Sequence, residues 1–173
     1  YINNLKFDFL INCSWQQLEY PKVWDLSYEL CISLLYEAKK NNSNALTIMD
    51  GPFYTLYPWS KKIYNLYSVR HSRYKKTKKF NNIKNKIKTI KTQELKKIKI
   101  KMEKEFIKYV PNFKKDYRFK KYVKTYRTLI DKKNDSRDYK IYYNKRIFNV
   151  LSGKIDHIFL ALNDIKKCLK NFS

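Results

Sequence analysis

The segment Leu26–Leu34 (LSYELCISL) decides the fold class, because large apolar residues alternate in it with small or polar ones. Successive residues of a β-strand point to opposite faces, so the alternation places the large apolar side chains on one face. A strand with one buried face is typical of an antiparallel sheet. The segment therefore predicts a half-buried antiparallel strand.

Further β-segments follow this strand and are separated from it and from each other by turns. Ala45–Met49 and Phe53–Tyr57 flank the turn residues Asp50–Pro52, and Tyr64–Arg70 is a fourth segment. Asp, Gly and Pro favour turns because they supply side-chain hydrogen bonds, positive φ angles or a fixed φ. We expect these segments to form an antiparallel sheet, joined later by Tyr122–Ile130.

Lys75–Val110 has a different pattern, with apolar residues mostly three to five positions apart in a Lys-rich background. That spacing places the apolar side chains on one face of a helix. It predicts one long basic helix or a broken pair of helices, ended by Pro111.

The two ends of the chain carry elements of another kind. Phe7–Cys13 (FDFLINC) is a continuous apolar run, which predicts a strand buried on both faces of a parallel sheet. Tyr139–Tyr143 and Ile147–Leu151 predict a hairpin, and Ile155–Leu169 an amphipathic helix. We expect this last helix to pack beside the Phe7–Cys13 strand, within a protein of the α+β class.

The charge balance is strongly basic. Lys and Arg number 39 against 15 Asp and Glu, which gives a formal net charge of +24 and indicates a polyanionic partner. The excess is nearly all Lys and accompanies abundant Asn, Ile and Tyr, the residues that A- and T-rich codons encode. Nucleic-acid sites interleave Lys with Arg, Gly and aromatic residues, whereas only two Gly are present here. We therefore expect any nucleic-acid binding to be non-specific.

The cysteines and the apolar runs bear on the cellular setting. Cys13, Cys31 and Cys168 are far apart and fit neither a disulfide framework nor a metal-ligand spacing. We expect reduced thiols in a cytoplasmic protein that holds no metal. No apolar run approaches the roughly 20 residues that span a bilayer, so no membrane partner is expected. The oligomeric state stays open.

The most specific motif is Leu151–His157 (LSGKIDH), where a predicted strand runs through Gly153 into the last helix. Gly allows a flat ligand or another backbone to approach closely, and the free N–H groups at a helix start stabilise negative charge. An ordinary strand-to-helix turn explains a single Gly equally well.

Several motifs taken together resemble FAD-dependent oxidoreductases of the amino-acid-oxidase-like class. Ser152–Lys154 is similar to the family's glycine-lysine element, which closes over the flavin pyrimidine, and Phe7–Trp15 looks like the strand before its Ala-Thr-Gly element. Here Cys13-Ser14-Trp15 replaces Ala-Thr-Gly. Met49–Pro58 and Ser68–Ser72 look like strands of the family's substrate domain.

The resemblance implies FAD as cofactor, a small-molecule substrate, and a set of site residues. Arg127 resembles the arginine that the family delivers towards substrate or flavin, and His71 is a candidate acid or base. The implied cofactor neighbours are Asn12, Cys13, Ser14, Gly153, Lys154, Ile155 and Asp156. In such enzymes the flavin accepts a hydride from an amine- or hydroxyl-bearing carbon, while the protein supplies orientation and electrostatics.

The resemblance also implies a division of the chain. Residues 1–20 are expected to belong to a Rossmann-like FAD-binding domain, residues 21–145 to a substrate domain with the antiparallel sheet and the Lys-rich helix, and residues 146–173 to the FAD-binding domain again. Gly51 and Gly153 are the only glycines, so the Gly-x-Gly-x-x-Gly phosphate loop does not occur in this sequence. We therefore expect a C-terminal portion of the enzyme, which lacks the pyrophosphate site.

Two other functions remain open at this point. A basic RNA-binding or ribosome-associated protein explains the charge directly but gives the SGKID turn no role. A structural remnant that keeps the fold and has lost catalysis is the third possibility. The sequence motifs identify neither the substrate nor the electron acceptor.

Overall fold

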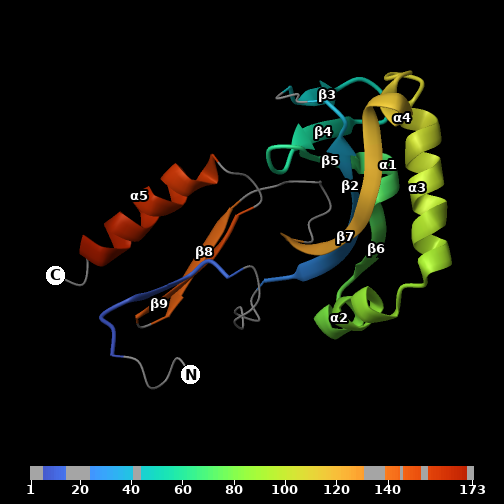
Figure 1. Cartoon of the computed structure of the whole chain (residues 1–173). Coiled ribbons are helices and arrows are strands. Elements are labelled where there is room, and N and C mark those ends of the chain that lie inside the picture. Colours follow the sequence, from blue (N-terminus) through green and yellow to red (C-terminus); the bar gives the residue numbers. More distant parts are fainter. Residues whose placement is uncertain are drawn as a thin grey trace. The chain divides into compact units, whose positions relative to one another are not determined.

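A computed structural model of the chain describes residues 6–14, 24–40, 44–130, 139–144, 146–152 and 156–170 (Figure 1). The chain forms two compact units, one made of residues 1–27 and 128–173 and the other of residues 28–127. The first unit is therefore built from both ends of the chain. The boundaries expected from the resemblance fall at residues 20 and 145, whereas the contacts place them at residues 27 and 127.

The unit of residues 28–127 is built on a six-stranded sheet. Its strands run in the order β3-β4-β5-β2-β6, and β7 also pairs with β2. The β3–β4, β4–β5, β2–β5 and β2–β6 pairs are antiparallel. The strands are β2 (Leu26–Ala38), β3 (Leu46–Ile48), β4 (Tyr54–Pro58), β5 (Ile63–Ser68), β6 (Arg73–Thr77) and β7 (Tyr117–Ile130). This confirms the predicted antiparallel sheet.

The long strand β2 is shared by two shorter strands. Its residues Leu34–Glu37 pair with β5, whereas Tyr28–Cys31 pair with β6. The short helix α1 (Val69–Ser72) lies between β5 and β6 in the chain. The expected strand Tyr64–Arg70 therefore ends earlier, at Ser68, whose side chain accepts a hydrogen bond from the backbone N–H of His71 and caps α1.

Two longer helices follow β6. They are α2 (Phe80–Thr89) and α3 (Thr92–Phe106), so the broken pair is confirmed and the single long helix is wrong. Lys75 also proves to lie in a strand. The chain breaks at Ile90, which is extended and buried. The Glu94 carboxylate then accepts a hydrogen bond from the backbone N–H of Lys91, at 2.9 Å, and so caps α3.

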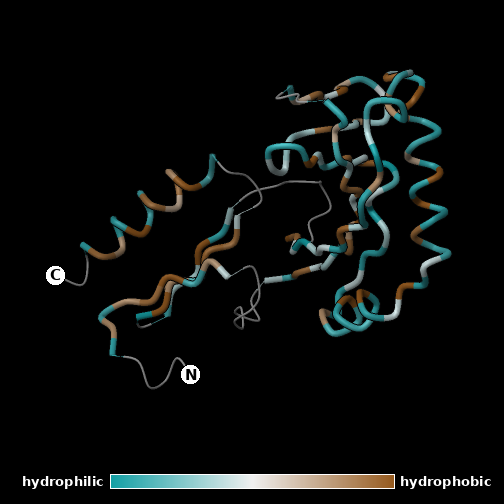
Figure 2. Tube along the Cα trace, viewed as in Figure 1, coloured by the Kyte–Doolittle hydropathy of each residue, from teal (hydrophilic) through white to brown (hydrophobic). Residues whose placement is uncertain are grey.

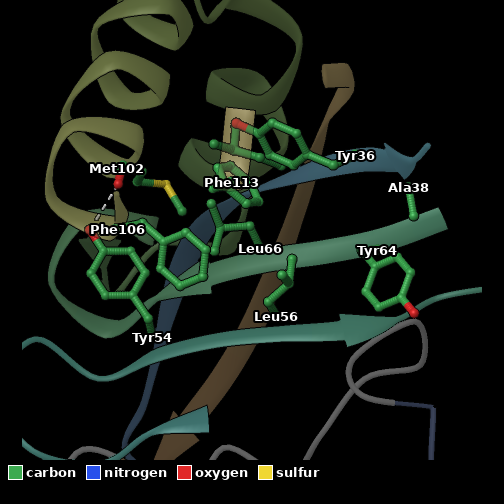
Figure 3. Packing of buried hydrophobic residues seen from close by; sticks show 10 residues of the cluster. Tyr36, Ala38, Tyr54, Leu56, Tyr64, Leu66, Met102, Phe106 and Phe113 are labelled. Atoms are coloured by element: carbon green, nitrogen blue, oxygen red, sulfur yellow. Dashed lines mark hydrogen bonds between the residues drawn. The ribbon is translucent and has the colours of Figure 1, made fainter. Parts of the chain in front are cut away.

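The core of this unit lies between the sheet and α3 (Figure 3). Hydrophilic and hydrophobic residues alternate along α3, which is amphipathic (Figure 2). Its Phe106 ring packs edge-on against Phe113, with 4.9 Å between ring centroids, where the short helix α4 (Phe113–Asp116) begins. The buried core residues are Leu34, Tyr36, Ala38, Tyr54, Leu56, Tyr64, Leu66, Met102, Phe106 and Phe113.

The unit formed by the two chain ends has a three-stranded sheet in the order β1-β9-β8. Its elements are β1 (Leu10–Asn12), β8 (Lys140–Asn144), β9 (Ile147–Leu151) and α5 (His157–Lys170). β1 runs parallel to β9, and β8 and β9 form the predicted antiparallel hairpin. Ala161 and Ile165 of α5 pack on Phe148 and Val150 of β9, so α5 lies on the sheet that contains β1.

β1 differs from its prediction in one respect. The sequence predicted a strand buried on both faces, yet β1 is a short edge strand with Ile11 49% exposed. The apolar run Phe7–Cys13 therefore does not form a strand buried on both faces. Taken together, the helices and the mostly antiparallel sheets confirm the α+β class. Across the described ranges, no helix has the length and apolar character needed to cross a membrane.

Candidate functional site

The parallel pair of β1 and β9 ends in a pair of buried amides. Asn12 lies opposite Asn149 in the register, and its Nδ2 donates a hydrogen bond of 2.8 Å to the Oδ1 of Asn149. The Asn12 Oδ1 accepts two further hydrogen bonds from Ser14, one from its backbone N–H at 3.1 Å and one from its hydroxyl at 2.7 Å. The amide thus fixes both the strand pairing and the turn that leaves β1.

This geometry brings two segments that are far apart in the sequence to one edge of the sheet. Cys13 and Ser14 follow β1, and Ser152 follows β9, in strands that run in the same direction. Ligands of parallel α/β sheets bind outside the carboxyl ends of the strands. Asp156, predicted to be at the site, is exposed just before α5. Gly153, Lys154 and Ile155 lie outside the described residues.

His157 begins α5 and is buried. Its ring lies 5.4 Å from the Tyr139 ring, measured between centroids, and its Nδ1 has no hydrogen-bond partner among the described residues. Tyr139 in turn donates a hydrogen bond of 2.6 Å to Asp164, which raises the pKa of the Tyr139 phenol. A buried ring nitrogen that has no partner among the described residues fits a site that a ligand or water completes.

A second cluster is centred on Glu29 in β2, whose side chain is 3% exposed. The Glu29 Oε1 accepts a hydrogen bond of 2.8 Å from Arg73 Nε. Its Oε2 accepts one from Arg127 Nε at 2.6 Å and pairs with the same guanidinium's terminal nitrogen at 2.5 Å. Arg127, the predicted substrate arginine, is thus held by a buried carboxylate that sequence reasoning missed.

Two weakly acidic groups adjoin this carboxylate. The Cys31 Sγ lies 3.8 Å from the Glu29 Oε2, and the Tyr67 hydroxyl lies 3.9 Å from the Cys31 Sγ. Burial first and the charge of Glu29 second raise the pKa of the Cys31 thiol. Burial likewise raises the pKa of Tyr67 to about 12. Both groups therefore stay protonated near neutral pH, which argues against a nucleophilic thiolate here.

His71 lies in α1, not on the strand where the sequence placed it, because the chain turns helical after Ser68. Its Nε2 is 2.6 Å from the Glu105 Oε2. That carboxylate also accepts hydrogen bonds from Tyr54 at 2.9 Å and from Arg70 at 3.1 Å. Tyr54 of β4 and two residues of α1, Arg70 and His71, therefore converge on one side chain of α3, which fixes the orientation of the His71 ring.

The segment Val69–Arg73 links the two clusters. Arg70 and His71 bind Glu105, whereas Arg73 binds Glu29. The structure thus places the predicted residues His71 and Arg127 in the same unit, each held by its own carboxylate. Glu29 could have been suspected from the sequence, because it is a charged residue within the apolar strand LSYELCISL, and such residues are rarely buried without a partner.

Acid should weaken the Glu105 cluster, which consists of Glu105, Tyr54, Arg70 and His71. Burial alone raises the pKa of Glu105, but the hydrogen bonds from Tyr54 and His71 and the charge of Arg70 lower it overall, below the ordinary glutamate range. A depressed pKa contributes stability above the unfolded-state value, about 4.3, and this contribution disappears as the pH falls through the folded-state value.

We therefore expect the difference in thermal midpoint between wild type and Glu105→Gln to be largest near neutral pH and to shrink below about pH 4. Thermal unfolding followed by circular dichroism at a series of pH values measures it. A difference in thermal midpoint between wild type and Glu105→Gln that stays constant down to acid pH would contradict the assigned role of Glu105.

Metal ligation has no support in the parts of the chain that the structure describes, which hold no cluster of three or more His, Cys, Asp or Glu side chains. The three cysteines are free thiols.

The Lys-rich helix α3 keeps most of its lysines exposed. Lys99 of α3 and Lys114 of α4 both pair with Glu103.

Comparison with curated proteins shows a distant similarity. No family model matches the chain. The chain is 26% identical, over 159 residues, to the FAD-dependent monooxygenase FPY4 of Fusarium mangiferae. The alignment covers 90% of this chain and 42% of FPY4, so the chain spans less than half the length of this relative.

Proposed function

We propose that this chain is the C-terminal part of an FAD-dependent oxidoreductase that transfers a hydride from an amine- or hydroxyl-bearing carbon to flavin. The observation that carries the proposal is the parallel β1–β9 pair, which brings Asn12–Ser14 and Ser152 to the same edge of the sheet. The similarity to an FAD-dependent monooxygenase supports the choice of cofactor.

The groups at this edge suit the polar rim of a flavin. Asn12, Asn149 and Ser14 supply neutral hydrogen-bonding groups, and the buried Nδ1 of His157 has no partner in the described part of the chain. Asn12, Cys13, Ser14 and the segment Gly153–Asp156 would hold the flavin ring. FAD supplies the hydride acceptor, and the protein supplies position and charge.

The amino-acid-oxidase-like assignment places substrate recognition in the unit of residues 28–127. Arg127 would hold a substrate anion or close the pocket, since a guanidinium presents several donors in a fixed plane. Glu29 occupies its Nε and one terminal nitrogen and thereby orients it. His71, oriented by Glu105, would take or return the substrate proton.

The remaining partner assignments follow from charge and exposure. A small molecule is the substrate, and nucleic acid binds only through non-specific contacts of exposed lysines that salt abolishes. Free thiols at all three cysteines fit the cytoplasm.

Substitutions at the β1–β9 edge test the proposal in the natural-length protein that contains this chain. Asn12→Ala removes the donor to Asn149 and the acceptor for Ser14, and we expect FAD occupancy to fall about tenfold.

Gly153→Leu should also lower FAD occupancy, because the larger side chain blocks close approach of the flavin ring. Lys154→Ala should lower the flavin midpoint potential, because a positive charge near the reduced anionic flavin is lost.

Asn163→Ala on the exposed side of α5 is the matched control and should leave flavin content unchanged. The measurements are flavin absorbance per protein and a redox titration. Unchanged FAD content and potential in all three folded variants would remove this edge from the cofactor site.

A further inference from the structure

A shallow cavity of about 420 Å³, largely open to solvent, lies on the unit of residues 28–127. It is lined by Gly51, Pro52, Phe53, Val69, Arg70 and Arg73. Three of these residues supply apolar surface, and the two arginines supply positive charge. Cavities of about 300–1,000 Å³ with apolar walls and few polar groups are typical of small-molecule sites.

Arg70 pairs with the carboxylate of the Glu105 cluster. Its NH1 donates a hydrogen bond of 3.1 Å to the Glu105 Oε1, while Tyr54 and His71 occupy the other carboxylate oxygen. The Arg70 side chain is nevertheless 66% exposed. One edge of the guanidinium is therefore fixed, and much of the rest of the side chain reaches solvent.

Arg73 is held in the same way by the other buried carboxylate. Its Nε donates to the Glu29 Oε1 at 2.8 Å, and Arg127 occupies the Glu29 Oε2. The Arg73 side chain is 40% exposed, so part of it also reaches solvent. An anion in the cavity can therefore contact the exposed parts of both arginines.

The backbone at the other wall of the cavity is conformationally unusual. Gly51 has a φ of 81°. Phe53 has a φ of 48°, a positive value that residues other than Gly rarely adopt. The Phe53 side chain is 46% exposed at this turn. Strained residues of this kind persist where the surrounding structure holds them, and they are frequent at ligand sites.

We propose that this cavity binds a small organic anion, a carboxylate carried on an aromatic or other apolar body. Arg70 and Arg73 bind the carboxylate, and Pro52, Phe53 and Val69 contact the apolar body. This site goes beyond the proposed oxidoreductase function, because it contains none of the residues assigned to the flavin and its binding can be measured without any cofactor.

Isothermal titration of the full chain with phenylacetate tests the site, with phenylacetamide and acetate as comparison ligands. We expect phenylacetate to bind, and both comparison ligands to bind at least about tenfold more weakly, because one lacks the charge and the other the apolar body. In NMR spectra the backbone signals of Gly51 and Val69 should shift with phenylacetate.

Two variants and one control locate the binding. Arg70→Gln should weaken phenylacetate about tenfold by removing one charged donor. Val69→Trp should weaken it by filling the cavity, without any change of charge. Arg118→Gln removes an arginine of similar exposure, 68%, that pairs with Glu37 and does not line the cavity, and should have no effect.

No binding of phenylacetate, equal binding of phenylacetamide, or equal weakening by Arg118→Gln would each overturn the proposal. Binding that survives Val69→Trp in the folded protein would do the same. A protein that binds phenylacetate as expected but holds no FAD at its natural length would refute the oxidoreductase function alone.

Discussion

Glu29→Ala is expected to lower the free energy of unfolding of the unit of residues 28–127 by about 3 kcal/mol, since removing one member of a buried ion pair leaves the other charge uncompensated. The lost carboxylate binds Arg73 and Arg127 at once, and its side chain is 3% exposed. We place the value at the low end of the range for buried pairs because both arginines reach solvent in part.

Urea unfolding followed by circular dichroism measures this effect. Glu37→Ala on the same strand is the control, because Glu37 pairs with Arg118 and Lys120 at the surface and its loss should shift the midpoint much less. The double variant Glu29→Ala with Arg127→Ala should recover part of the lost stability. Equal losses in the Glu29 and Glu37 variants would refute the central position of Glu29.

Phe106→Ala is expected to destabilise the same unit by about 3–5 kcal/mol, the usual cost of removing a fully buried aromatic side chain. Phe106 is 0% exposed, and its ring lies 5.2 Å from Tyr54 and 4.9 Å from Phe113. The substitution thus leaves a cavity between α3 and the sheet.

Ile100→Ala is the control on the same helix. Ile100 is 61% exposed, so its truncation should change the free energy of unfolding by no more than about 0.5 kcal/mol. Thermal and urea unfolding of both variants give the comparison. A similar loss from the two substitutions would show that α3 packs with another face against the sheet.

The sequence predicted the fold best where a single period persists over many residues. Alternation in LSYELCISL and the three-to-five spacing of apolar residues in the segment that forms α2 and α3 each follow directly from the geometry of the element. Alternation was less informative about burial, because Glu29 and Cys31 on the polar face of β2 are buried as well. Which face a neighbouring element covers is a tertiary property that a local pattern does not encode.

The candidate site was predictable only in part. The parallel pairing that joins Asn12 to Asn149 spans 137 positions of the chain, and local periodicity carries no record of such a contact. The same holds for Glu29 with Arg127 and for Glu105 with His71, each brought together by the sheet and α3. A local preference was also overridden at Lys75, where pairing with β2 draws Lys-rich sequence into a strand.

The most direct test of the account is the flavin content of the natural-length protein that includes this chain. It should be purified under native conditions, denatured, and the released cofactor identified by chromatography. The account predicts FAD in near-stoichiometric amount, with bleaching of the bound flavin under anaerobic conditions by an amine or alcohol substrate. A folded, colourless protein that carries no FAD and cannot be loaded with it would contradict the account.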